Sequence, residues 1–561
     1  MLRISLLSMR IIFYFSSYYF INLNEIIIEW EVISINSTNI HLIFILDRMS
    51  IFFIFLVRLI SGSVIIFSTR YIISEKFFSR FIILVFFFIM SIFLLILRPN
   101  LISLLLGWDG LGVTSYLLVI FYQRNKSYNA GILTAITNRL GDAGLLISIS
   151  FFLYLGNWNF TFINSFFDIL SNILVYLIVI SACTKSAQIP FSAWLPAAIA
   201  APTPVSALVH SSTLVTAGVY LLIRINIIII EINIRYLLLL IGIITILMAG
   251  ITAIIEIDIK KIIALSTLRQ LGIMILTLGI GNPILSYFHL LSHAFFKAIL
   301  FMCAGIVIHN IKDYQDIRKI GLRYRNLNFC ISLILIANMS LCGLPFLRGF
   351  YSKDLIIEII IIKGKNLFLF FIFIFGTILT VIYSCRLNFL VGLNFLKSES
   401  LFFISENSNF ILIGIIFLLP FSIIGGIVIS WKIINLNKLI FLPIWLKLRV
   451  LSIILFSLVF FYYIFIKLNN YKNSIRIWFF SNIWFLPISA NVSLTKLNLR
   501  LSSFFFKFVE ISWSEIFIYN FYLNLINNNY VRKFLDYLSY IYIIQIIEIF
   551  VIIFLIFFII R

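Results

Sequence analysis

The stretch Lys185-Ser-Ala-Gln-Ile-Pro190-Phe-Ser-Ala-Trp-Leu-Pro196, with Pro202 and Pro204 soon after it, decides the fold. A proline inside a helix removes a backbone hydrogen bond, so this segment cannot be one regular helix. Yet it lies in a long apolar run, and broken backbone at membrane depth is tolerated only where protein buries it or it lines a cavity. The stretch therefore predicts a broken membrane helix that carries a buried lysine, which is typical of ion sites in transporters.

Composition supports a membrane protein. Of the 561 residues, 62% are hydrophobic and only 11% are charged. Lys and Arg number 42 against 21 Asp and Glu, a net charge of +21, but no run of five or more basic residues exists, so a nucleic-acid partner is not expected. The chain is predicted to have lipid as its main solvent.

Spanning the hydrocarbon takes roughly 20 helical residues, and fifteen stretches are long and apolar enough. They are approximately 4–23, 43–68, 81–97, 100–121, 130–155, 170–200, 205–225, 236–255, 262–280, 284–309, 327–362, 367–391, 409–430, 449–467 and 541–560. They lack the alternation of barrel strands, and an open sheet cannot span lipid. We expect an all-α polytopic membrane protein with about 15 transmembrane helices.

A second predicted break lies in the eleventh stretch, which reads Gly343-Leu-Pro345-Phe-Leu-Arg348-Gly-Phe-Tyr-Ser-Lys353-Asp354. Each break thus carries a lysine. Further along, polar residues recur at helical spacing among aromatic and aliphatic ones between 490 and 540, which predicts a long amphipathic helix that does not span.

Ionisable groups deep in apolar spans are costly and are functional candidates by default. In chain order they are Asp109, Arg139, Asp142, Lys185, His210, His289, His293, Lys297, Lys353, Asp354 and Arg386. His289, His293 and Lys297 are four residues apart and share one helical face, which is suited to lining a hydrated path.

Simpler interpretations stand beside these. Arg139 and Asp142, three residues apart, are also consistent with a local ion pair. A lone His210 on an apolar face is more often a hydrogen-bonded core residue, and Arg386 is also consistent with a side chain that reaches toward a lipid headgroup. The five cysteines form no C-x-x-C pair and have no histidine at ligand spacing, so neither a metal site nor a cluster is expected.

Several motifs together resemble the antiporter-like, proton-pumping subunits of mitochondrial respiratory complex I. They are the stretch from Lys185 through His210, Asn138-Arg-Leu-Gly-Asp142, His293-Ala-Phe-Phe-Lys297 and Gly349-Phe-Tyr-Ser-Lys353-Asp354. The similarity is dense from about residue 47 to 390 and thinner beyond.

The resemblance implies two inverted five-helix repeats, each with one broken helix, and a lateral helix at the C-terminus. It implies a division into 1–99, N-terminal helices; 100–225, first repeat; 236–391, second repeat; 392–489, C-terminal helices; 490–540, lateral helix; and 541–561, terminal anchor. In such a subunit Asp109, Lys185, His210, Lys297, Lys353 and Asp354 would carry protons, with Arg139, Asp142, His289, His293 and Arg386 in support. The family usually has a glutamate where Trp108 is followed here by Asp109, whose side chain is one methylene shorter.

The resemblance also implies the setting. The chain would be a multi-pass subunit of NADH:ubiquinone reductase in the mitochondrial inner membrane, with no redox centre of its own. NADH, FMN, iron–sulfur clusters and ubiquinone would be bound by partner subunits, and its own partners would be neighbouring antiporter-like subunits and phospholipids. Two alternatives remain open, namely a subunit of a multi-subunit Na⁺/H⁺ antiporter and a non-transporting scaffold that retains the fold.

Overall fold

The computed structural model describes residues 26–35, 38–72, 75–154, 158, 169–232, 234–311, 314–320, 327–363, 367–393, 409–433, 442–468, 479–486 and 495–508. The chain divides into two compact units, Met1–Pro487 and Ile488–Arg561. The predicted spans 4–23 and 541–560 lie outside the described residues.

The first described element is a β-hairpin, which corrects the all-α prediction. Strand β1 (Ile26–Ile35) pairs antiparallel with β2 (Thr38–Leu46), in a register that places Ile26 opposite Leu46. Isoleucine is abundant in both strands, and β-branched side chains favour extended backbone.

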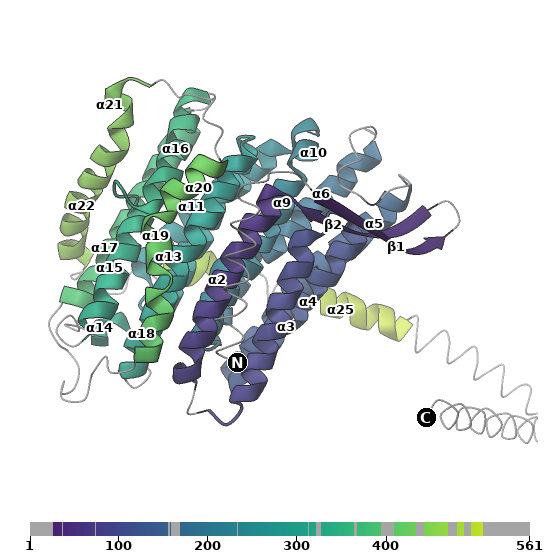
Figure 1. Cartoon of the computed structure of the whole chain (residues 1–561), viewed down its shortest axis with the longest axis horizontal. Coiled ribbons are helices and arrows are strands. Elements are labelled where there is room, and N and C mark those ends of the chain that lie inside the picture. Colours follow the sequence, from purple (N-terminus) through teal and green to yellow (C-terminus); the bar gives the residue numbers. More distant parts are fainter. Residues whose placement is uncertain are drawn as a thin grey trace, which may run out of the picture. The chain divides into compact units, whose positions relative to one another are not determined.

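After the hairpin, the described elements are all helices. The first group comprises α2 (Arg48–Tyr71), α3 (Phe78–Leu97), α4 (Leu101–Val119), η1 (Ile120–Tyr122), α5 (Asn125–Tyr154) and α6 (Ile169–Lys185). Figure 1 shows α3, α4 and α5 on one side of α2, and α3 packs on α4 as α4 does on α5.

The first predicted break is confirmed. After α6 the chain forms η3 (Phe191–Ala193), α7 (Trp194–Ala197), η4 (Ala198–Ala200), α8 (Thr203–Val205), the π-helix η5 (Ser206–Thr213), α9 (Leu214–Arg224) and α10 (Asn226–Glu231). Only short turns of helix thus connect α6 to α9, as the four prolines predict.

The second group of helices contains the second break. It comprises α11 (Arg235–Ile255), α12 (Ile259–Gly279), α13 (Pro283–Asn310), α14 (Ile317–Ile320), α15 (Asn328–Cys342), α16 (Arg348–Lys363), α17 (Leu367–Asn388) and η7 (Phe389–Leu393). The predicted interruption falls between α15 and α16, where Gly343 has a φ of 91°, a conformation that glycine adopts without strain. Helices α12 and α13 are buried along their apolar lengths and form the centre of the bundle.

The remaining described elements are α18 (Asn409–Ile416), α19 (Leu419–Ile423), α20 (Gly425–Ile433), α21 (Ile444–Lys447), α22 (Arg449–Leu468) and η8 (Ile483–Phe485). In the second unit, α25 (Thr495–Phe505) is described, and it falls where the predicted amphipathic helix begins. Within 490–540, residues 490–494 and 509–540 lie outside the described residues.

The described helices give a smaller number of spans than the fifteen predicted. Ten are long and apolar enough to cross a membrane, or eleven if the bent pair Leu412–Ile423 and Gly425–Lys432 is one span. Two of the fifteen, 4–23 and 541–560, lie outside the described residues, and the broken stretches 170–200 and 327–362 are divided into helices too short to cross alone. The chain is a mostly helical membrane protein, and its two inverted repeats stay a prediction.

Candidate functional site

Lys185 is the last residue of α6, where that helix breaks, and it is fully buried. Its ammonium donates a hydrogen bond of 2.6 Å to the backbone carbonyl oxygen of Trp108 and lies 4.3 Å from the centre of the Trp108 ring. A desolvated cation over an indole face is stabilised by about 2 kcal/mol. Trp108 therefore holds this ammonium in place without supplying an opposite charge.

Two carboxylates act on Lys185 from farther away. Asp142 exerts the larger electrostatic effect on the ammonium and Asp109 the next, but neither forms an ion pair with it among the residues that the structure describes. One carboxylate oxygen of each aspartate is buried without a hydrogen-bond partner in the same part of the chain. A buried oxygen without a partner is costly, so a water molecule that donates a hydrogen bond to either carboxylate would be bound favourably.

Asp142 also confirms the simpler interpretation of its neighbour, because Arg139 lies 3.4 Å from it as a local ion pair. The two partners differ in environment. The side chain of Asp142 is only 7% exposed, whereas that of Arg139 is 64% exposed in the middle of α5. Arg139 therefore belongs to a face of α5 rather than to the buried series.

One side chain and one backbone amide near the first break donate hydrogen bonds to carbonyl oxygens at the end of α6. The indole nitrogen of Trp194 donates to the carbonyl oxygen of Thr184 at 2.9 Å, and the backbone nitrogen of Gln188 donates to that of Cys183 at 3.0 Å. Unpaired carbonyls at the end of a buried helix would otherwise be costly. The break is thus a stable feature that presents Lys185 to the interior.

His210 lies in the π-helix η5 and is 1% exposed. Its ring centre is 6.4 Å from that of Trp194. Neither ring nitrogen has a hydrogen-bond partner among the described residues, so the interpretation of His210 as a hydrogen-bonded core histidine is not supported. Packing, including the contact with Trp194, therefore positions the ring without a hydrogen bond to either nitrogen from the described residues.

The three predicted groups of α13 are fully buried. The two ring nitrogens of His289 lie 3.0 Å from the Ser352 hydroxyl and 3.1 Å from the Gln270 carbonyl oxygen. The ring of His293 lies 6.5 Å from that of His289, and its nitrogens have no partner within the described ranges. One helical turn farther on, Lys297 donates a hydrogen bond to the Ser266 hydroxyl of α12.

The structure does not pair the two adjacent residues of the second break. Lys353 is 3% exposed, and its ammonium donates to the carbonyl oxygen of Leu341, near the end of α15. Asp354 makes no ion pair with it, and one oxygen of that carboxylate is buried without a partner in the described part of the chain. The charges that act on Asp354 are those of Glu358 and Lys447 instead.

Arg386 is a helix cap. Its guanidinium donates to the backbone carbonyl oxygen of Glu256 at 2.7 Å and to that of Ala253 at 3.5 Å, where α11 ends. Cations are stabilising at this end of a helix. The arginine therefore binds backbone rather than reaching toward a headgroup.

Two buried arginines were missed by the sequence analysis. Arg269 in α12 donates to the carbonyl oxygen of Gly376, and Arg348 at the start of α16 donates to those of Phe421 at 2.6 Å and Leu291 at 3.1 Å. Both lie in apolar stretches, so the rule that singled out the other charged groups would have found them. Gln270, Ser266 and Ser352 carried no comparable signal, because uncharged polar residues are common in membrane helices.

No group of three or more His, Cys, Asp or Glu residues that could hold a metal ion occurs in the described ranges. None of the five cysteines forms a disulfide bond, and four of them are buried. The buried polar series thus consists of lysine, histidine, aspartate and hydroxyl groups, which can hold and pass protons.

Three family models match the chain. "NADH:quinone oxidoreductase/Mrp antiporter, TM" covers residues 99–380, "NADH-Ubiquinone oxidoreductase (complex I), chain 5 N-terminus" covers 30–82, and "NADH dehydrogenase subunit 5 C-terminus" covers 383–560. Among curated proteins, NADH-ubiquinone oxidoreductase chain 5 of Aedes aegypti is 46% identical over 531 residues, which is 91% of this chain and 90% of that protein. The chain 5 of Locusta migratoria is 45% identical over 520 residues, 90% of each chain.

Two solved structures share the fold. The Mrp complex from Dietzia sp. DQ12-45-1b contains a chain that aligns with a TM-score of 0.74 over 92% of this chain and 59% of that chain. The membrane-bound sulfane sulfur reductase, an archaeal respiratory complex, aligns with a TM-score of 0.68 over 76% and 88%. Both are 21% identical in sequence, so this likeness concerns the fold alone.

Proposed function

Since this chain belongs to the NADH-ubiquinone oxidoreductase chain 5 family, we propose that its buried polar series carries protons across the membrane. One observation carries the proposal. Lys185 and Lys353, each at a broken helix, are almost completely buried, and both donate to backbone carbonyls rather than to carboxylates. A lysine without a permanent counter-ion can change its protonation when a nearby charge changes.

The chain is a membrane subunit of respiratory complex I and takes part in coupling NADH:ubiquinone electron transfer to proton translocation. The redox chemistry belongs to other subunits of the complex. We assign NADH, FMN, the iron–sulfur clusters and ubiquinone to those partners. We assign this chain to the mitochondrial inner membrane, because its relatives in the insects Aedes aegypti and Locusta migratoria are named NADH-ubiquinone oxidoreductase chain 5.

In the proposed path, Asp109 and Asp142 modulate Lys185, and His210 passes the proton toward His289, His293 and Lys297 of α13. Lys353 and Asp354 follow, and the Ser352 hydroxyl, which contacts His289, connects the two segments. Arg386 supports the arrangement by capping α11. Gaps between these groups exceed hydrogen-bond reach, so water is required to bridge them.

The energies are of the right size. Two unit charges 4 Å apart interact by about 4 kcal/mol at an effective dielectric constant of 20. Moving a proton against roughly 150 to 200 mV costs about 3.5 to 4.6 kcal/mol. A lysine and a carboxylate that approach to about 4 Å would therefore change their interaction energy by an amount comparable to the cost of moving one proton.

The α5 face supports the proposed partner. Arg139 is 64% exposed at mid-span, and Ile132, Ile136 and Leu140 around it are more than half exposed as well. An arginine facing lipid at this depth is costly. We propose that a neighbouring antiporter-like subunit covers this face, and that the segment 490–540 runs along such neighbours with phospholipids beneath it.

The experiment compares membrane vesicles that contain the assembled complex with variant chains. Lys185→Ala and Lys353→Ala are expected to lower the number of protons translocated per NADH oxidised, normalised to assembled complex. Lys261→Ala is the matched control, because Lys261 is 43% exposed and pairs with Asp258 at the surface. An unchanged ratio for both variants would favour the scaffold alternative.

The antiporter alternative predicts a different dependence. A Na⁺/H⁺ antiporter subunit would require sodium for proton movement, whereas a redox-driven pump would not. The match of residues 383–560 to a subunit 5 C-terminal model favours the pump. Proton translocation at equal rates in sodium and in choline media is the expected result.

A further inference from the structure

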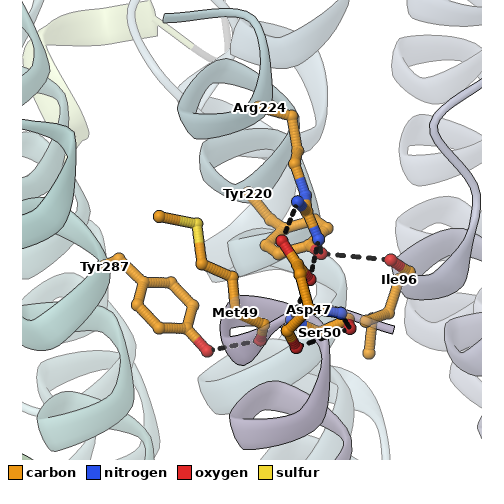
Figure 2. Close-up of polar contacts among 7 residues, drawn as sticks. All are labelled: Asp47, Met49, Ser50, Ile96, Tyr220, Arg224 and Tyr287. Atoms are coloured by element: carbon orange, nitrogen blue, oxygen red, sulfur yellow. Dashed lines mark hydrogen bonds and ion pairs between the residues drawn. The ribbon is translucent and has the colours of Figure 1, made fainter. Parts of the chain in front are cut away.

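A network of polar contacts joins the helices α2, α3, α9 and α13 through side chains that are not part of the series described above (Figure 2). Asp47 precedes α2, and its carboxylate accepts two hydrogen bonds from Arg224 of α9, at 2.5 and 2.9 Å. Arg224 also donates to the hydroxyl of Tyr220 at 2.5 and 2.9 Å. Tyr220 in turn donates to the carbonyl oxygen of Ile96 in α3 at 3.1 Å.

The fourth helix joins through α2. Tyr287 of α13 donates from its hydroxyl to the carbonyl oxygen of Met49 at 2.6 Å, in the first turn of α2. That turn is itself fixed by Asp47, because the carboxylate accepts from the backbone nitrogen of Ser50 at 2.9 Å, and the Ser50 hydroxyl accepts from the backbone nitrogen of Asp47. Asp47 therefore has two roles, as the N-cap of α2 and as the anion for Arg224.

The helices held here are those that carry the central histidines. α9 continues the π-helix of His210, and α13 carries His289 and His293. Neither His210 nor His293 has a polar partner among the described residues, so the spacing of the two rings depends on how their helices are held. Arg224 is fourteen residues from His210, about 21 Å along an ideal helix, so a small rotation at Arg224 displaces the imidazole.

The π-helix makes this end more important. Each backbone hydrogen bond of a π-helix joins residues five apart, one more than in an α-helix, and the hydrogen bonding is less regular. No side chain caps the N-terminus of η5. The π-helix η5 packs on α13, α9, α8 and α2, so the helices that surround His210 include three of those that the Asp47 network joins.

We propose that Asp47 is a positioning residue for proton transfer, which fixes the C-terminal end of α9 and the N-terminal end of α13 and thereby sets the distance between His210 and the α13 histidines. This inference rests on the proposed proton path. Asp47 would thus be required for proton transfer although it touches none of the groups that carry the proton.

The test uses the assembled complex in membrane vesicles. Asp47→Asn keeps an oxygen that can cap α2 but removes the charge that binds Arg224. We expect it to lower protons translocated per NADH, in the direction of Lys185→Ala, and to change the pH profile of that ratio while NADH oxidation per assembled complex is retained. Asp47→Glu, which restores the carboxylate, is expected to restore the ratio at least in part.

Tyr220→Phe is the second variant, because it removes only the hydroxyl and keeps the ring contact with Phe53 at 5.1 Å. It is expected to lower the ratio as well, so the inference stays testable if Asp47→Asn fails to assemble. Asp316→Asn, which removes an exposed contact with Arg318, is the control. If the ratio and its pH profile are unchanged in the Asp47 and Tyr220 variants while Lys185→Ala lowers the ratio, the inference is overturned and the proposed function stands.

Discussion

The ammonium of Lys185 binds the carbonyl oxygen of Trp108 at 2.6 Å, and that partner cannot accept a proton at physiological pH. The contact therefore fixes where the ammonium lies and leaves its protonation to charges farther away. Asp142 ranks before Asp109 among those charges, although Asp109 directly follows Trp108 in sequence.

This ranking gives a first prediction. Asp142→Asn is expected to lower protons translocated per NADH more than Asp109→Asn, because Asp142 is buried whereas Asp109 is only partly buried, and a buried charge is screened less by solvent. Both substitutions conserve size, so assembly should be similar. The measurement is acidification or alkalinisation of vesicles per NADH oxidised. A larger loss with Asp109→Asn would contradict the prediction, because it would mean that Asp109 acts on Lys185 more strongly than Asp142 does.

A second prediction concerns Lys353 and Asp354. They are neighbours in sequence, yet successive side chains on a helix point about 100° apart, and the structure joins Lys353 to Leu341 and not to Asp354. Lys353→Ala is therefore expected to reduce proton translocation strongly, and Asp354→Asn to reduce it less. Equal losses in the two variants, at equal amounts of assembled complex, would contradict this.

The fold was predictable where hydrophobic length decides it. Apolar runs near 20 residues gave helices such as α11 and α13 within a few residues of their observed ends, and prolines located the first break. The hairpin of β1 and β2 was missed because two apolar strands of nine or ten residues are too short to span, and their β-branched content was not weighed.

The candidate site was predictable as a set of residues but not as a set of contacts. Charge in an apolar span marked Lys185, His289 and Lys297 because burial is costly for any such group. Which partner each binds depends on rotamers and on neighbours distant in sequence, as with Trp108, which lies 77 residues before Lys185. Asp47 and Arg224 are 177 residues apart in sequence, and no local sequence pattern predicts that they pair.

A third prediction concerns how the contribution of Asp47 to the stability of the fold changes at acid pH. Burial acts to raise the pKa of Asp47, but the hydrogen bonds and the charge of Arg224 outweigh it, so the pKa lies below its ordinary value of 3.8. A carboxylate with a lowered pKa stabilises the fold fully above its unfolded pKa, and this stabilisation is lost as the pH falls through the folded value.

Asp47→Asn is therefore expected to lower the unfolding temperature of the complex by a constant amount from pH 5 to 8, since both pKa values lie below that range. Hydrogen bonds to charged groups contribute about 1.5 to 3 kcal/mol each, which sets the scale of the loss. Thermal unfolding of wild type and variant in parallel provides the measurement. Below about pH 4 the difference is expected to shrink, because Asp47 is protonated first in the unfolded chain and then, at lower pH, in the folded protein, and a difference that grew in acid would contradict the assignment.

The last prediction tests how closely the second break is packed. Gly349 lies in the first turn of α16, and a methyl carbon added to it would overlap the carbonyl oxygen of Ser340 in α15. Backbone cannot move aside as a flexible side chain can, so the two helices would have to separate, at a cost of about 1 to 3 kcal/mol or more. Separation would also displace the carbonyl oxygen of Leu341 that binds Lys353. Gly349→Ala is expected to lower both the amount of assembled complex and the protons translocated per NADH.

Gly112→Ala in α4 is the control, since no atom lies within 4 Å of its added carbon and alanine favours a helix by up to about 1 kcal/mol over glycine. Equal assembly and equal pumping in the two variants would mean that α15 and α16 are not held together as closely as the structure places them.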